Sequence, residues 1–574
     1  MLDFDGREVP QRSHPLRGSL WMAALLAIVL LATRPVELGD TRVYANDIVA
    51  RLGKSPLGPA NSIWEPGHLF WRPLGWVLES LAGPILSRLT DWTPFMQVSF
   101  LLMAVSVLCA LTTVVLWHAM VLRLTGSRGI AFLVCLAMAC SDGFLLRVDS
   151  GSAYVPALML LTVGLCCLSA GRTLTGALFY ALSALTWLPF ILAGPSMLMV
   201  AALPSWNWKA PVREAVMKMD RRAAVRFVVG SAAIVLLMYG FALYAMGATS
   251  AGEAAKWFSQ ASHGYAPNIK VVRIASGLPR SFLFLGKDAI LYKRYLRHDP
   301  YAPVTLWQIA GASFWKVAAF YLSAVCLLYE LVRRPRSARM LMLVGLGAVP
   351  TILFAITLFE TGSPERYVPA LLFIVLATAW ALRDFPSSGR ATQYVVAGFL
   401  VCVILTNVYA FAAPRVEAEN SESVARVADL RNRLTPGSIV MLSTDQDDLD
   451  ETVNRLAFDR INRPAPMWMY YIVNTGNVQV LTWRQNLAAR TLQVWRNGGE
   501  VWVSKRVWSS RPMRSWNWAE GDDPRVSWKE LPQFFSTLHT DAESGGTDGF
   551  RRLARDQQNL AALTPLASGA QPLP

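Results

Sequence analysis

Two carboxylates capable of acid–base chemistry lie in a long hydrophilic stretch near the start of the chain, residues 39–76. Asp40 and Asp47 are seven positions apart, with Tyr44 between them. If this stretch is helical, the three side chains share one face, and a rise of about 1.5 Å per residue separates the two carboxylates by about 10 Å. That distance is too large for both to bind one metal ion. The spacing therefore indicates that only one of them is central, and Asp40, which follows the end of the first apolar span, either has a function near the lipid headgroups or caps the helix.

The same stretch continues with WEPGHLFWRPLGW, residues 64–76, which mixes tryptophans with Glu65, His68 and Arg72. Tryptophans at this density are typical of an interfacial segment that is anchored among lipid headgroups. His68 can exchange a hydrogen bond or a proton near neutral pH. The tryptophans therefore predict an anchored loop, and its polar residues are candidates for substrate contact.

A second hydrophilic segment, SDGFLLRVDSGS at residues 141–152, contains Asp142 and Asp149. Asp149 precedes an apolar run and could be the N-cap of a helix. Alternatively, a second loop that brings an aspartate to the same surface as Asp40 would form a shared acidic site. Asp149 is the catalytic candidate of this pair, and Asp142 a substrate contact.

A third segment, GSPERYVP at residues 362–369, resembles the start of a helix. Ser363 suits the N-cap, Pro364 suits the first turn, and Glu365 complements the positive end of the helix dipole. Arg366 does not fit, because a cation in the first turn opposes that dipole. An arginine beside exposed helix amides favours an anion such as phosphate. Glu365, Arg366 and Tyr367 are therefore candidate substrate contacts.

Apolar spans must position these segments. The chain has 574 residues, of which 53% are apolar and 16% charged, and it has a positive mean hydropathy. Apolar runs long enough to cross a bilayer recur through residues 20–413, which predicts a polytopic α-helical membrane domain of about eleven helices. The expected spans are residues 20–32, 95–117, 129–140, 153–168, 174–203 as two short helices broken at Trp187-Leu188-Pro189, 227–248, 315–332, 340–359, 367–382 and 394–411.

Basic residues in the short connections set the expected orientation. Residues 1–19 should be cytoplasmic and the C-terminus extracytoplasmic, in a membrane such as the bacterial inner membrane. The outer loops are then residues 34–94, 141–152, 249–310 and 360–366. One of them is itself basic, and its Lys293 and Arg294 are candidate contacts for an anionic ligand.

The formal charge of +15 is explained by these connections and by anionic headgroups, so no nucleic-acid partner is expected. The seven cysteines lie in or beside apolar spans, without the spacing of a zinc site or a disulfide framework. Residues 414–545 predict a small soluble α/β domain, with strands at 438–443 and 500–508 and helices near 421–434, 449–461 and 482–497. Residues 546–574 read as a loose tail.

Taken together, the acid after the first span, the acid in the next outer loop, the paired short helices and the late ERY turn resemble the GT-C superfamily of polytopic glycosyltransferases. The layout over residues 20–413 is similar to the protein-mannosyltransferase and aminoarabinose-transferase branches. The resemblance implies a polyprenyl-phosphate sugar donor, an acceptor glycan, lipid or protein, and inversion of the anomeric centre. It places Asp40 on the general base, Asp149 or Asp142 on the second acid, and Arg366 on a phosphate contact.

Neither an adjacent Asp-Glu pair nor a DxD motif is present in these loops, so the resemblance leaves the role of a divalent metal open. The competing hypothesis is a transporter or flippase for lipid-linked saccharides, although transporters usually carry ionisable residues at mid-membrane depth. A further alternative makes the C-terminal domain the active part. The expected substrate-binding residues are Asp47, Glu65, His68, Arg72, Asp142, Lys293, Arg294, Glu365, Arg366 and Tyr367.

Overall fold

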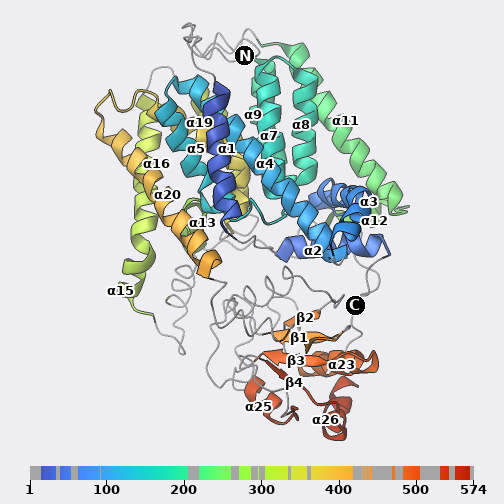
Figure 1. Cartoon of the computed structure of the whole chain (residues 1–574). Coiled ribbons are helices and arrows are strands. Elements are labelled where there is room, and N and C mark those ends of the chain that lie inside the picture. The colour runs from blue at the N-terminus through green and yellow to red at the C-terminus, as the bar shows by residue number, and fades with distance from the viewer. Residues whose placement is uncertain are drawn as a thin grey trace. The chain divides into compact units, whose positions relative to one another are not determined.

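The computed structural model describes residues 15–33, 39–53, 63–90, 92, 94–203, 219–259, 271–285, 295, 304–333, 338–357, 363–417, 430, 433–435, 438–442, 468–471, 483–504, 530–541 and 550–568. The chain divides into two compact units (Figure 1). Unit 1 spans residues 1–55, 59–81 and 98–416, and unit 2 spans residues 56–58, 82–97 and 417–574.

Unit 1 is a bundle of apolar helices, and each expected span coincides with one of them. Six helical stretches in the described residues are long and apolar enough to cross a membrane: α4 (Pro94–Thr125), α11 (Arg221–Ala245), α15 to α16 (Leu306–Arg333), most of α17 to α18 (Ala338–Thr357), η5 to α19 (Pro364–Leu382), and residues 391–411 of α20 (Ala391–Glu417). Shorter apolar helices complete the bundle: α1 (Pro15–Leu31), α5 (Arg128–Ala139), α7 (Tyr154–Ser169), α8 (Thr173–Thr186), and η2 (Leu188–Ala193) followed by α9 (Gly194–Ala202).

The α7–α8 pair is packed closely because glycines face each other across it. A Cβ on Gly164 would lie 3.3 Å from the Gly176 carbonyl oxygen, so small residues let the two backbones approach. The predicted break after α8 is confirmed: α8 ends at Thr186, and Pro189 lies in the short 3-10 helix η2 that follows. This break leaves Trp187 in an extended conformation at the end of α8, close to the start of α7.

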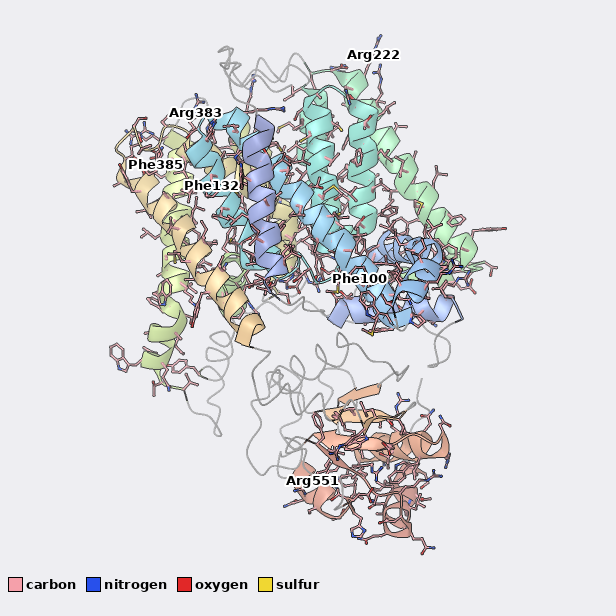
Figure 2. All side chains as sticks on the ribbon, viewed as in Figure 1. Phe100, Phe132, Arg222, Arg383, Phe385 and Arg551 are labelled. Atoms are coloured by element: carbon pink, nitrogen blue, oxygen red, sulfur yellow. The ribbon has the colours of Figure 1, made fainter. Side chains whose placement is uncertain are left out.

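The hydrophilic segments singled out in the sequence form short elements at one end of the bundle. They are α2 (Gly39–Arg51), η1 (Pro66–His68), α3 (Trp71–Leu89), α6 (Asp142–Leu145), α12 (Ala251–Ser259), α13 (Val271–Phe282) and η5 (Pro364–Tyr367). Figure 2 shows Arg222, Arg383 and Phe385 at the opposite end. There Glu330, which is fully buried, binds Arg390 and Thr392. The connections expected on opposite sides of a membrane thus lie at opposite ends of the bundle.

Unit 2 contains a small α/β fold built on four short strands. They are β1 (Ile439–Leu442), β2 (Trp468–Tyr471), β3 (Val501–Ser504) and β4 (Phe550–Arg552), in the order β2-β1-β3-β4. β1 is parallel to β2 and β3, whereas β4 is antiparallel to β3. The helices of this unit are α23 (Trp483–Arg496), α25 (Glu530–Ser536) and α26 (Gln557–Ala567). The predicted strands near 438–443 and 500–508 and the helix near 482–497 are confirmed as β1, β3 and α23. Most of the other two predicted helices lies outside the described residues.

The prediction of a loose tail after residue 545 is wrong for residues 550–568. β4 pairs with β3, and α26 packs against α23. Leu553 and Leu563 are buried in the same core as Val501 and Phe535. These apolar residues give the end of the chain enough buried surface to fold, so the α/β domain continues through α26.

Candidate functional site

α2 is held against the segment that leads into α7. The Thr41 hydroxyl donates a hydrogen bond to the Ser150 carbonyl, and the Trp71 indole donates to the Gly151 carbonyl (3.1 Å). Gly151 has φ +74°, and a Cβ there would lie 2.7 Å from the Thr41 side chain. Only glycine suits both the positive φ and this close approach. The two hydrophilic segments that were predicted separately from sequence are therefore joined.

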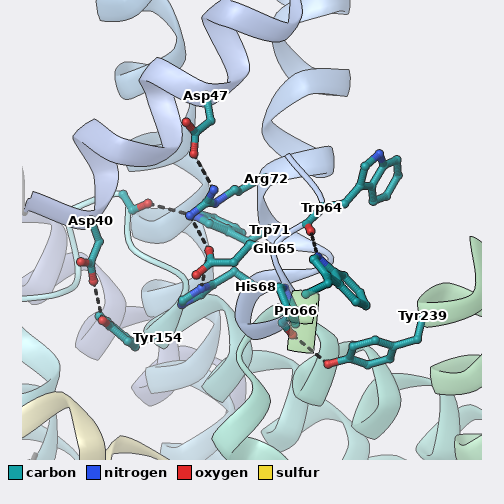
Figure 3. Close-up of polar contacts among 12 residues, drawn as sticks. Asp40, Asp47, Trp64, Glu65, Pro66, His68, Trp71, Arg72, Tyr154 and Tyr239 are labelled. Carbon is teal, nitrogen blue, oxygen red and sulfur yellow. Dashed lines mark hydrogen bonds and ion pairs between the residues drawn. The ribbon is translucent and has the colours of Figure 1, made fainter. Parts of the chain in front are cut away.

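Asp40 lies in the first turn of α2, where a carboxylate complements the helix dipole. It is half-buried, and its Oδ2 accepts a hydrogen bond from the Tyr154 hydroxyl, as Figure 3 shows. The Tyr154 ring packs edge-on against Trp187, with a centroid separation of 4.5 Å. The structure thus places Asp40 in contact with a neutral phenol at the start of α7.

Arg366 reaches the same place from η5, far along the chain. Its guanidinium carbon lies 5.9 Å from the centroid of the Trp187 ring, which is cation–π distance. Contacts therefore run without a break from Asp40 through Tyr154 and Trp187 to Arg366. We call Asp40 and Arg366 the open pair, because the contacts that connect them pass through neutral aromatic rings.

Tyr44 lies on the same face of α2 and is buried among these charges. Burial is the main cause that raises its pKa above the ordinary value of 10.0; Asp40 and Glu65 raise it further, and Arg72 and Arg366 lower it. Charged side chains from α2, from the residue before η1, from α3 and from η5 therefore all influence this one phenol. Helix α2 covers residues 39–51, which confirms the prediction that residues 40, 44 and 47 share one helical face, and Arg366 lies within electrostatic range of Tyr44 on that face.

Asp47 belongs to a different set of contacts. Arg72 binds Asp47 (Nη1–Oδ2, 2.5 Å) and also Glu65, and His68 Nδ1 lies 3.1 Å from Glu65 Oε2. All four side chains are buried. Burial raises the pKa of Asp47 to about 6, while Arg72 lowers it and Glu65 raises it. We call Asp47, Arg72, Glu65 and His68 the ion-pair chain (Figure 3).

A second buried group joins α6, α13 and η5. Arg147 binds Glu365 (Nη2–Oε2, 2.5 Å) and donates to the Asp142 carbonyl oxygen (3.4 Å). Burial raises the pKa of Asp142 to about 6; Arg147 and Arg280 lower it, and Glu365 raises it. Ser281 also donates to the Pro364 carbonyl oxygen (3.1 Å). We call Asp142, Arg147, Arg280 and Glu365 the paired cluster, because its opposite charges face one another.

Some of the remaining predicted site residues are buried, and others lie outside the described residues. Asp149 is buried, but it is not the N-cap of α7, because that position is Ala153. Tyr367 is fully buried at the start of α19. Ser363 is the N-cap residue of η5 as predicted, with Pro364 in the first turn, although its side chain forms no capping hydrogen bond. Lys293 and Arg294 lie outside the described residues.

Sequence reasoning missed Tyr154, Trp187, Arg147 and Arg280. Tyr154 follows the second acidic segment directly, and Trp187 marks the predicted helix break, so position relative to recognised features could have drawn attention to both. Nothing in the local sequence distinguishes Arg280 from the other cations of its basic loop. Within the described part of the chain, His, Cys, Asp and Glu side chains form no group of three that could hold a metal ion.

Comparison with known proteins supports a shared fold. No family model matches the chain, and no curated protein sequence matches it. The structure is similar to ArnT from Cupriavidus metallidurans bound to undecaprenyl phosphate, with 12% identity and a TM-score of 0.51, covering 95% of this chain and 98% of that chain. An Archaeoglobus fulgidus oligosaccharyltransferase tethered to an acceptor peptide aligns at 13% identity and a TM-score of 0.48, covering 95% and 74%. The chain is an integral membrane protein, and its fold is similar to that of ArnT.

Proposed function

We propose that this protein is a membrane glycosyltransferase that moves a sugar from a polyprenyl-phosphate donor to an acceptor hydroxyl group. The observation that carries the proposal is the open pair: from α2 a half-buried carboxylate contacts Tyr154, and from η5 an arginine lies over Trp187, which packs against Tyr154. The fold shared with an enzyme whose structure contains undecaprenyl phosphate supports the same donor class.

The two charges suit the two ends of such a reaction. The acceptor oxygen attacks the anomeric carbon, Asp40 takes the hydroxyl proton, and the bond between that carbon and the phosphate oxygen breaks. The polyprenyl phosphate leaves with the bonding electron pair, and Arg366 stabilises the developing charge on it. Attack from the face opposite the leaving phosphate inverts the anomeric centre. Trp187, which is buried, packs between the two groups and holds them apart.

The site faces the extracytoplasmic side in this proposal. Its elements come from alternate connections of the bundle, which the charge pattern places outside, and they meet at one end. Residues 1–19 are then cytoplasmic and unit 2 is extracytoplasmic, where it could bind the acceptor or a partner. A bacterial inner membrane fits this arrangement, since the donor lipid is made available there to cell-envelope glycans.

The test is a transfer assay with purified protein in detergent or nanodiscs. The donors are radiolabelled undecaprenyl phosphates that carry mannose, glucose, arabinose or aminoarabinose, and the acceptors are a membrane lipid extract and a cell-envelope glycan fraction. We expect one donor to give a labelled product that the Asp40→Asn variant does not form. Movement of the labelled lipid across vesicles without any transfer would instead support a transporter and overturn the proposal.

A further inference from the structure

His68 has a buried ring nitrogen that the folded chain does not use. Its Nδ1 faces Glu65 Oε2 at 3.1 Å, but Nε2 is buried and has no hydrogen-bond partner among the described residues. The residue is 6% exposed. A buried polar atom without a partner costs on the order of 1–3 kcal/mol, so such an atom calls for an explanation.

The ion-pair chain fixes which ring nitrogen carries the proton. An ionised carboxylate only accepts hydrogen bonds, so the nitrogen that faces Glu65 must be Nδ1–H. Glu65 is itself held by Arg72, and Arg72 by Asp47. In the neutral ring this leaves Nε2 as a lone-pair acceptor. The ring therefore presents an acceptor of fixed orientation, held by three buried charged side chains.

The location of this acceptor points to a substrate. The His68 ring lies 5.2 Å from the ring of Tyr44, one helical turn after Asp40. In Figure 3 the imidazole extends from η1 towards the side on which Asp40 and Tyr154 lie. Arg72 also lies over the Tyr44 ring, at 5.0 Å, and Asp40 raises the pKa of Tyr44, so the ion-pair chain and Asp40 both act on this phenol.

We propose that His68 Nε2 accepts a hydrogen bond from a substrate hydroxyl group, and that Glu65 positions it to do so. A lone-pair acceptor suits a hydroxyl group, which can donate, and does not suit an ionised phosphate, which cannot. The hydroxyl group belongs either to the acceptor or to the sugar of the donor. This inference rests on the proposed glycosyl transfer, and it gives the site a substrate contact beyond the open pair.

Two substitutions separate the ligand role from a structural one. In His68→Asn the shorter amide can still donate to Glu65 from near the Nδ1 position, but nothing replaces Nε2. In His68→Gln the longer amide places an acceptor oxygen near the Nε2 position. If His68 only holds Glu65, Asn should be the milder change; if Nε2 binds substrate, Gln should be the milder one.

The experiment measures transfer kinetics with the donor and acceptor that the wild-type protein uses, and binding of undecaprenyl phosphate without a sugar. We expect His68→Asn to raise one KM about tenfold, the worth of one lost hydrogen bond, and His68→Gln to restore most of it. A raised KM for the acceptor assigns the hydroxyl group to the acceptor, and a raised KM for the donor assigns it to the sugar. Binding of undecaprenyl phosphate should be unchanged in both variants.

Two results would contradict the role proposed for His68. If wild-type protein transfers sugar and His68→Asn does so with unchanged KM values, Nε2 contacts water and the inference is wrong. If His68→Asn weakens binding of undecaprenyl phosphate itself, the ring donates to phosphate and the inference is also wrong. Failure of the wild-type protein to transfer any sugar would overturn the proposed function instead, so the two failures are distinct.

Discussion

Two groups of charged residues at the same end of unit 1 differ in what their charges face. In the paired cluster, Glu365 binds Arg147, and Asp142 and Arg280 influence each other's ionisation inside a buried group. In the open pair, Asp40 contacts a phenol and Arg366 lies over an indole. Glu365 and Arg366 are neighbours in the chain and their charges interact, yet they contact different side chains. Adjacent residues of η5 therefore take opposite roles, one in holding the turn and one in facing the aromatic rings.

The contrast between the paired cluster and the open pair indicates which residues are expected to act on the substrate. Opposite charges that face each other in a buried place have partners within the protein, so breaking such a pair destabilises the fold, and the pair offers little to a ligand. Asp40 and Arg366 are both half-buried and contact aromatic side chains, so we expect a proton and a phosphate, respectively, to reach them. If this comparison is right, substitutions in the open pair should change transfer, and substitutions in the paired cluster should change stability.

The largest expected effect is on transfer by Asp40→Asn. Loss of a general base lowers kcat by about 10²–10⁴-fold, whereas the amide keeps the shape of the side chain. Binding of undecaprenyl phosphate and the melting temperature should be close to those of the wild-type protein. Asp47→Asn is the matched control on the same helical face, and its kcat should fall much less. Equal losses of kcat in the two variants would break the distinction between these two aspartates.

The next effect is on stability, in Arg147→Gln. Removing one partner of a buried ion pair costs about 3–5 kcal/mol, because the carboxylate of Glu365 loses the arginine that it binds. We expect a clearly lower melting temperature in detergent. The double variant Arg147→Gln/Glu365→Gln should recover part of this loss, since it leaves no unpaired charge. A single variant as stable as the wild-type protein would show that the cluster does not hold η5.

Arg366→Gln should have a smaller effect, and on the donor. A hydrogen bond to a charged group contributes about 1.5–3 kcal/mol, which corresponds to roughly 10- to 100-fold weaker binding of undecaprenyl phosphate. Lys at this position keeps the charge but not the planar fork. The affinity of Arg366→Lys for undecaprenyl phosphate should therefore lie between those of the wild-type protein and Arg366→Gln. The measurement is an equilibrium binding titration. Unchanged binding in Arg366→Gln, with a normal melting temperature, would remove the phosphate role of Arg366.

The sequence predicted the elements of this site better than its contacts. Asp40 and Arg366 could be singled out because their local setting is unusual: an acid next to the end of a span, and a cation at the wrong end of a helix. The helix break at Trp187 was also predictable, because Pro189 disfavours an uninterrupted helix.

The partners of these residues were not predictable, since they come from distant parts of the chain. Tyr154 is 114 positions from Asp40, and Glu365 is 218 positions from Arg147. Local patterns carry no information about which loops meet. For the same reason the roles expected for Glu65 and Arg72 as substrate contacts could not be separated from their pairing with each other. At the end of the chain, apolar residues are scattered between polar ones, so the sequence pattern did not predict β4 and α26.

The smallest effect concerns the pH dependence of stability, and it belongs to the paired cluster. In the folded protein the pKa of Asp142 is raised from 3.8 to about 6, chiefly by burial. Between these two values the folded state holds a proton that the unfolded state releases. The contribution of Asp142 to stability is therefore fully present below about pH 4 and is lost as the pH rises through about 6.

Asp142→Asn should remove this contribution while keeping the side chain's shape. Because other carboxylates titrate over the same range, the measurement is the difference in melting temperature between Asp142→Asn and the wild-type protein, taken at intervals from pH 4 to pH 7. Relative to the wild-type protein, the variant should gain stability as the pH rises through this range. Asp47 carries a similar shift, so adding Asp47→Asn should enlarge the gain. A difference that stays constant with pH would mean that Arg147 and Arg280 offset the effect of burial, so that the pKa of Asp142 is not raised in the folded protein.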